Sequence, residues 1–227
     1  QSFVDELVRA SRRELETLRD SEHVGPPPKA TFLALSGGGN NGAFGAGIIC
    51  GWTLNGERPK FTVVTGVSTG ALIAPFALLG PDYDDKLREA YTSLSTNQII
   101  TRRSLLSAFF DDALFDSSPL RRLVELLIDQ EVVDGLAAEY ARGRLLVVAT
   151  TNLDTNKSVF WNVTAIAASG DPRAMELIHD VLIASSSIPG AFPPVMIDVV
   201  ADGRHFQEMH VDGATKSQVF LFPSSFD

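Results

Sequence analysis

Three short stretches of this sequence contain residue types that could carry out nucleophilic catalysis. The first, residues 66–70, reads Gly-Val-Ser-Thr-Gly and joins an apolar predicted strand to an apolar predicted helix. A G-x-S-x-G sequence in that setting takes the chain through a strained turn that raises the serine hydroxyl above the sheet. We interpret Ser68 as a candidate nucleophile, with Gly66 and Gly70 letting strand and helix pack closely. The alternative is that Ser68 or Thr69 only caps the helix.

The second stretch is rich in glycine, since residues 36–42 read Ser-Gly-Gly-Gly-Asn-Asn-Gly. Consecutive glycines let backbone N–H groups converge on a negatively charged group, particularly just before a helix. A phosphate loop of the G-x-x-x-x-G-K-[ST] type would need a lysine that is missing here. We favour an oxyanion hole formed by the N–H groups of Gly37, Gly38 and Gly39, with Gly42 supporting the turn. A tight turn that binds no ligand is the alternative.

The third stretch supplies a carboxylate, because an activated serine needs a neighbouring base. Asp212 ends an apolar stretch and is followed by Gly213 and Ala214. The competing interpretation is plain turn chemistry, which we expect for the other Asp-Gly pair, Asp202-Gly203. The chain also holds histidines, none with neighbours that mark it as catalytic: His23, His179, His205 and His210.

The elements that must position these residues alternate between strands and helices. Predicted strands cover residues 31–35, 61–65, 145–150, 159–163, 195–200 and 205–211. Predicted helices cover residues 2–20, 43–54, 71–79 and 82–92, and others begin at Ser118 and after Asp171. Alternation with continuous apolar strands predicts an α/β fold with three layers, α/β/α, around a mostly parallel central sheet. Both glycine-bearing turns then fall at the carboxyl ends of strands, where such sheets bind ligands.

Helical spacing of apolar residues predicts which faces point inward. In the leading helix we expect Val4, Leu7, Val8, Leu15 and Leu18 to face the protein. The helix at residues 43–54 is small and apolar, which indicates a buried helix. The helix after Asp171 should bury Met175, Ile178, Val181 and Leu182 and turn His179 toward its polar side. Residues 93–117 have no regular pattern but contain large apolar side chains that would suit an acyl chain or an ordinary core.

Composition narrows the class of protein. The 227 residues are 44% hydrophobic and 21% charged, as in a soluble globular domain. The net charge of −9 argues against nucleic acid and against attraction to anionic membranes, although apolar contact with a lipid surface stays open. One cysteine and scattered histidines give no disulfide framework and no metal-ligand spacing, so we expect no metal and no other cofactor. The compartment stays open, because we expect any targeting segment to lie outside a chain that begins at Gln1. The sequence also leaves the oligomeric state open.

Together, and in this order, these stretches resemble the patatin-like phospholipases. The matching segments are residues 36–42, 66–70 and 212–214, and residues 184–194 are similar to the family's small-residue and proline segment. The resemblance runs from about residue 31 to residue 214. The family's glycine loop often carries Arg or Lys where this chain has Asn41, which removes a cation but leaves the N–H groups unchanged.

The resemblance implies a patatin-like catalytic domain over residues 30–227, preceded by a helix and proline-rich linker over residues 1–29. Family domains often continue further, so the C-terminal part of this one could be incomplete. The family's chemistry implies a lipid acyl hydrolase in which Ser68 attacks an ester carbonyl and forms an acyl-enzyme. Asp212 would accept the proton and pass it to the leaving alcohol, without histidine or cofactor.

Other interpretations remain at this stage. A Ser–His–Asp α/β-hydrolase could use His205 or His210 with an acid such as Asp198. A catalytically silent lipid-binding module and a nucleotide-binding protein are further alternatives. The sequence leaves the substrate open among phospholipids, galactolipids, monoglycerides and short esters.

Overall fold

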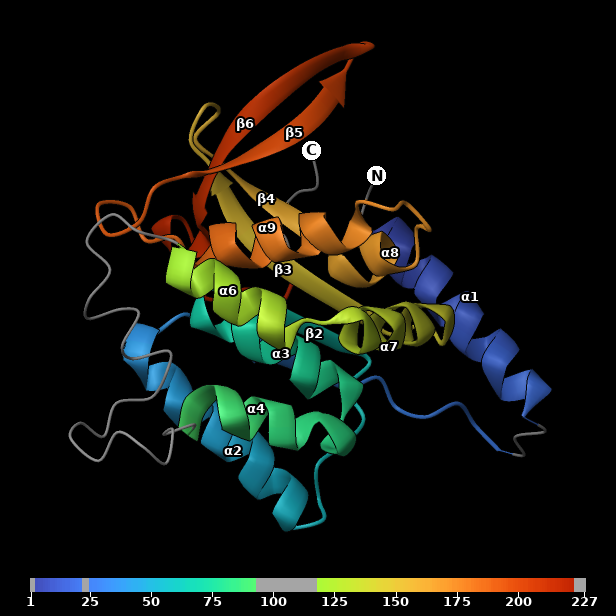
Figure 1. Ribbon diagram of the computed structural model, residues 1–227. Coiled ribbons are helices and arrows are strands. Elements are labelled where there is room, and N and C mark those ends of the chain that lie inside the picture. The colour runs from blue at the N-terminus through green and yellow to red at the C-terminus, as the bar shows by residue number, and fades with distance from the viewer. Residues whose placement is uncertain (1–2, 22–24, 93–117, 223–227) are drawn as a thin grey trace.

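A six-stranded sheet runs through the centre of the protein, with helices on both of its faces (Figure 1). The computed structural model describes residues 3–21, 25–92 and 118–222. The predicted α/β class is therefore confirmed. His23 and the irregular apolar stretch at residues 93–117 lie outside the described residues.

The sheet is parallel over only half of its strands. Its order is β1-β2-β3-β6-β5, and β4 also pairs with β3. The bounds are β1 Phe32–Leu35, β2 Val63–Val67, β3 Leu145–Asn152, β4 Lys157–Asn162, β5 Val195–Ala201 and β6 Arg204–Asp212. The first three strands are parallel, whereas β3 with β4, β3 with β6 and β5 with β6 are antiparallel. The prediction of a mostly parallel sheet is therefore corrected to a mixed sheet. Strands β4 and β6 each follow a turn of only a few residues, whereas a parallel neighbour needs a long crossover.

Strands β2 and β6 lie end to end and pair with consecutive stretches of β3. Val67, the last residue of β2, pairs with Ala149 of β3, and Asp212, the last residue of β6, pairs with the next residue, Thr150. Because β2 runs parallel and β6 antiparallel to β3, their carboxyl ends point toward each other. Residues that follow β2 are thereby brought against the end of β6.

Most helices cover one face of the sheet. They are α2 Gly42–Leu54, α3 Thr69–Leu79, α4 Asp84–Thr92, α6 Ser118–Leu127, α7 Gln130–Ala141, α8 Val163–Ala167 and α9 Ala174–Ser186. They pack against Val64, Leu146 and Val148. Helix α1 (Phe3–Asp20) covers the opposite face, where it meets Val63 and Leu145. No sequence prediction covered α7 or α8.

The predicted inward faces hold only in part: Ile178, Val181 and Leu182 of α9 are buried as predicted, but other residues differ from the prediction. In α1 the buried residues are Phe3 and Ala10, whereas Val4, Val8 and Leu15 are exposed, because the apolar arc of this helix is wider than the surface that it covers. In α9, Met175 is exposed and His179 is buried. The predicted burial of α2 holds only for its inner face, since Phe44, Ile48 and Leu54 are exposed: this helix packs on α3 and α4 from one side.

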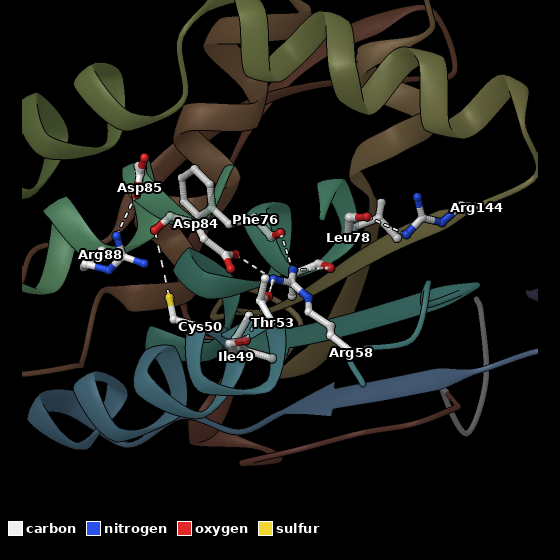
Figure 2. A network of polar contacts seen from close by, with 11 residues as sticks. Ile49, Cys50, Thr53, Arg58, Phe76, Leu78, Asp84, Asp85, Arg88 and Arg144 are labelled. Carbon is white, nitrogen blue, oxygen red and sulfur yellow. Dashed lines mark hydrogen bonds and ion pairs between the residues drawn. The ribbon is translucent and has the colours of Figure 1, made fainter. Parts of the chain in front are cut away.

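The central helix α3 is anchored at its C-terminal end by Arg58 (Figure 2). The guanidinium donates through Nη2 to the carbonyls of Phe76 and Ala77, at 2.9 and 3.0 Å. Its Nη1 lies 2.6 Å from a carboxylate oxygen of Asp84, and the two side chains are only 2% and 7% exposed. Arg144 donates to the next carbonyl, that of Leu78. Cations at a helix C-terminus satisfy carbonyls that lack helical partners and oppose the negative end of the helix dipole.

We predict that Arg58→Met lowers the free energy of unfolding by about 3–5 kcal/mol, because it leaves the Asp84 carboxylate buried without its cation. Urea denaturation measures the change. The matched control is Arg88→Met, which breaks an ion pair with Asp85 at the same 2.6 Å but with side chains 49% and 93% exposed. That control should cost less than about 1 kcal/mol. Equal losses in the two variants would contradict this account.

Candidate active site

Ser68 lies at the turn between β2 and α3, in a backbone conformation that residues other than glycine rarely adopt. Its φ is 54° and its ψ is −127°. Holding a residue other than glycine there costs about 1–3 kcal/mol. The flanking glycines make the turn possible: a Cβ on Gly66 would lie 2.7 Å from the Cα of Ala71, and one on Gly70 would overlap the backbone of Leu35. The turn therefore has the geometry that lifts a serine side chain out of the sheet at the carboxyl end of a strand.

The structure brings Ser68 and Asp212 together. The Ser68 hydroxyl donates to Oδ2 of Asp212 at 2.6 Å, and the backbone N–H of Ala214 donates to Oδ1 at 2.8 Å. Both residues are only 2% exposed. Burial raises the pKa of Asp212, and the two hydrogen bonds lower it by less. A carboxylate with a raised pKa is a better proton acceptor than an ordinary aspartate. Gly213 lets it approach β3, because a Cβ there would lie 2.5 Å from the carbonyl oxygen of Ala149.

None of the histidines in the described ranges is hydrogen-bonded to Ser68. His179 donates to the carbonyl of Ile128, and His205 is exposed on β6. His210 is fully buried, with Nδ1 2.9 Å from the Thr150 hydroxyl and Nε2 3.2 Å from Glu208. Burial lowers the pKa of His210. The arrangement that a Ser–His–Asp triad requires is therefore not formed by these three histidines.

The two Asp-Gly pairs lie at opposite ends of β6, as their sequence contexts predict. Asp202 and Gly203 have φ of 50° and 72° and form the turn between β5 and β6. Asp202 therefore lies at the opposite end of β6 from Asp212. In Figure 1 this hairpin extends away from the helices at the top of the molecule.

The glycine loop lies against the serine turn, but only part of it is available to a ligand. Gly37 donates its N–H to the carbonyl of Gln218 at 3.0 Å, which corrects the prediction that it joins the oxyanion hole. A Cβ on Gly37 would lie 3.1 Å from the Cβ of Ser68, so this glycine instead leaves room beside Ser68. Within the described part of the chain, the N–H groups of Gly38 and Gly39 have no hydrogen-bond partner.

Thr69 couples this loop to the start of α3. Its hydroxyl donates to the carbonyl of Gly39 at 3.0 Å. Its methyl group occupies the space that a side chain on Gly42 would need. The loop and the serine turn are thereby held in contact. The side chain of Asn41, at the position where the family often has a cation, makes no capping hydrogen bond.

Sequence reasoning missed two residues that tie the site together, Ser185 and Ser187. The Ser185 hydroxyl accepts from the backbone N–H of Ser68 at 3.0 Å and donates to the carbonyl of Ala149 at 2.8 Å. The carbonyl of Ser187 accepts from the backbone N–H of Asp212 at 2.9 Å. The end of α9 thus holds both members of the pair. The signal was present in the small-residue segment at residues 184–194, which the sequence resemblance did not resolve into individual roles.

No cluster of three or more His, Cys, Asp or Glu residues that could hold a metal ion occurs in the residues that the structure describes. A cavity of about 400 Å³ lies between the first turns of α9 and strand β5, and neither Ser68 nor Asp212 lines it.

Comparison with known proteins yields one family. A family model described as patatin-like phospholipase matches residues 33–222. No curated protein matches the chain. Among solved structures, the crystal structure of VipD from Legionella pneumophila has a TM-score of 0.43 and 14% sequence identity to it. That match covers 88% of this chain and 48% of the VipD chain, so the chain spans about half the length of VipD.

We predict that Ser185→Ala slows covalent labelling of Ser68 by a fluorophosphonate about tenfold or more, because the Ser68 N–H loses its acceptor and the strained turn relaxes. It should also lower the free energy of unfolding by about 1–3 kcal/mol, the cost of a buried unpaired donor. The control is Ser186→Ala, since the Ser186 hydroxyl is equally buried but has no partner among the described residues. Labelling rate and unfolding should change little in the control. Similar labelling rates in the two variants would show that Ser185 does not position the serine.

Proposed function

This chain belongs to the patatin-like phospholipase family, and we propose that it is a serine hydrolase that cleaves fatty acyl esters of lipids through Ser68 and Asp212. The observation that carries the proposal is the 2.6 Å hydrogen bond between the Ser68 hydroxyl and the Asp212 carboxylate. It occurs at a strained turn, beside the glycine loop, where the N–H groups of Gly38 and Gly39 have no hydrogen-bond partner among the described residues. In this proposal Ser68 is the nucleophile, Asp212 is the base, and Gly38 and Gly39 are the oxyanion donors.

In the proposed reaction, the Ser68 oxygen attacks the ester carbonyl carbon while its proton passes to Oδ2 of Asp212. The negative charge that develops on the carbonyl oxygen is held by the N–H groups of Gly38 and Gly39. The tetrahedral intermediate then expels the alcohol, which takes the proton from Asp212 and leaves the acyl group on Ser68. Water, deprotonated by Asp212, attacks this ester, and the proton returns to Ser68 as the fatty acid leaves.

The environment of Asp212 supports its use as the base in place of histidine. An ordinary aspartate has a pKa near 3.9 and accepts protons poorly at neutral pH. Burial raises the pKa of Asp212, and no cation forms an ion pair with it in the described part of the chain. The short hydrogen bond also holds the Asp212 carboxylate against the hydroxyl proton that it would remove from Ser68.

The proposal is tested with phospholipids and with p-nitrophenyl esters of increasing acyl length. Carboxyl esters should be cleaved, and chelation of divalent metals should leave the rate with a soluble ester unchanged. Ser68→Ala should abolish turnover and keep the fold, because the nucleophile is lost and its turn is held by backbone contacts. Undiminished turnover by Ser68→Ala would refute the mechanism.

We predict that Asp212→Asn lowers the rate of ester hydrolysis by about 10²–10⁴, because the amide keeps the size but cannot accept a proton. Steady-state kinetics with a soluble ester measure this loss. The controls are Asp202→Asn and His205→Ala, at the remote hairpin, which should retain most of the activity. A dead His205→Ala would contradict the assignment of the base.

The same variant should be more stable than the parent at neutral pH. Because the folded pKa of Asp212 is raised above 3.8, the folded state binds its proton more tightly than the unfolded state does. The parent therefore loses stability as pH rises from about 3.8 through the folded pKa. Asp212→Asn lacks this loss, so its advantage in urea denaturation should appear in that window and persist at neutral pH. An advantage that is largest below pH 3 would contradict the raised pKa.

A further inference from the structure

Helix α2 has an outer face that is apolar along its whole length. Phe44, Ile48 and Leu54 are 75%, 49% and 82% exposed. The small residues on the same side, Ala43, Gly47 and Gly51, are exposed as well, and no acidic or basic residue occurs in the helix. Single exposed apolar side chains are ordinary, but a contiguous uncharged face marks an interaction surface.

This face begins at the candidate active site. Gly42, the first residue of α2, packs on Thr69, the neighbour of Ser68 in sequence. Phe44 therefore lies in the first turn after the glycine loop, and the face extends about 15 Å further to Leu54. The inner face of α2 is held in the core by Ala46 and Ile49, so the outer face is presented on a fixed support.

Helix α1 offers the contrast within the same molecule. Its outward apolar residues, Val4, Val8 and Leu15, are also exposed, but charged residues such as Asp5 and Arg12 are exposed among them. It also covers the opposite face of the sheet from α2. Among the described helices, only α2 combines an uncharged outer face with a position beside Ser68.

We propose that the outer face of α2 docks the protein on the surface of an uncharged or zwitterionic lipid layer; this inference rests on the proposed function. A lipid ester is presented at such a surface, and Phe44, Ile48 and Leu54 would enter the layer beside the glycine loop and Ser68. The charge of the chain indicates which kind of lipid surface this face would bind. The net charge of −9 and the lack of cations on α2 give no attraction to anionic headgroups, so binding depends on apolar burial.

The test is flotation of the full chain with phosphatidylcholine vesicles, in a Ser68→Ala background so that no lipid is cleaved. Replacing Phe44, Ile48 and Leu54 together by Gln should lower the partition coefficient at least about tenfold, because three apolar side chains no longer enter the layer. The control replaces Val4, Val8 and Leu15 by Gln and should change binding less than about twofold. Replacing a third of the phosphatidylcholine by phosphatidylserine should not strengthen binding. Equal losses in both triple variants, no loss in the α2 variant, or binding only to vesicles with phosphatidylserine would overturn the proposal.

A single variant keeps the proposal testable if the α2 triple variant does not fold. Phe44→Trp places a fluorophore at a site that is already exposed, so packing should not change. Its emission, corrected for the two native tryptophans, should shift to the blue with phosphatidylcholine vesicles and be quenched by brominated lipid. No shift would overturn the proposal. Sedimentation velocity tests whether this face binds a second copy of the chain instead of lipid. Loss of a dimer in the α2 variant, with vesicle binding unchanged, would mean that it does.

These outcomes are separable from those of the proposed function. If the parent chain cleaves no ester while α2-dependent flotation persists, the hydrolase proposal fails and the docking surface stands. If the parent chain cleaves soluble esters but flotation does not depend on α2, only the docking inference fails.

Discussion

The arrangement of β2 and β6 along the same side of β3 is the constraint on which the site depends. One strand runs parallel to β3 and the other antiparallel, and the last residue of each pairs with consecutive residues, Ala149 and Thr150. Two carboxyl ends therefore meet inside the sheet. Ser68 and Asp212 come within 2.6 Å of each other although 144 residues separate them in sequence.

This meeting point is costly for stability, and the surrounding structure compensates. Ser68 has an unfavourable backbone conformation, and Asp212 is a buried carboxylate with no cation paired to it in the described part of the chain. The end of α9 holds the backbone of both residues through Ser185 and Ser187. At the far end of α3, the helix that follows Ser68, Arg58 donates to the carbonyls of Phe76 and Ala77. Stored strain of this kind is typical of catalytic sites, where a reactive group is held ready for its substrate.

Sequence reasoning selected Ser68 and Asp212, which the structure brings together, because their signals are local. The turn around Ser68 requires glycine on both sides, and Asp212 differs from Asp202 by ending an apolar strand rather than filling a hairpin turn. What it missed depends on tertiary contacts. The pairing of the Gly37 N–H with Gln218 follows from where the chain passes after β6, and no local pattern reports it. The direction of β6 against β3 and the roles of Ser185 and Ser187 are likewise set by distant segments.

The apolar composition of α2 suggested burial, but composition alone cannot tell a core helix from one with an exposed apolar face. Among the described helices, none has both the length and the hydropathy to pass through a bilayer.

The central claim is that the chain forms a covalent acyl-enzyme on Ser68 with Asp212 as its base. The most direct test is to quench the protein in acid during turnover of a p-nitrophenyl fatty acyl ester and to map the acylated peptide by mass spectrometry. We expect one acyl group, carried by Ser68, that accumulates in the parent chain and is absent after the same interval in Asp212→Asn. An acyl group on any other residue, or turnover with no covalent intermediate when quench times are shorter than one catalytic cycle, would contradict it.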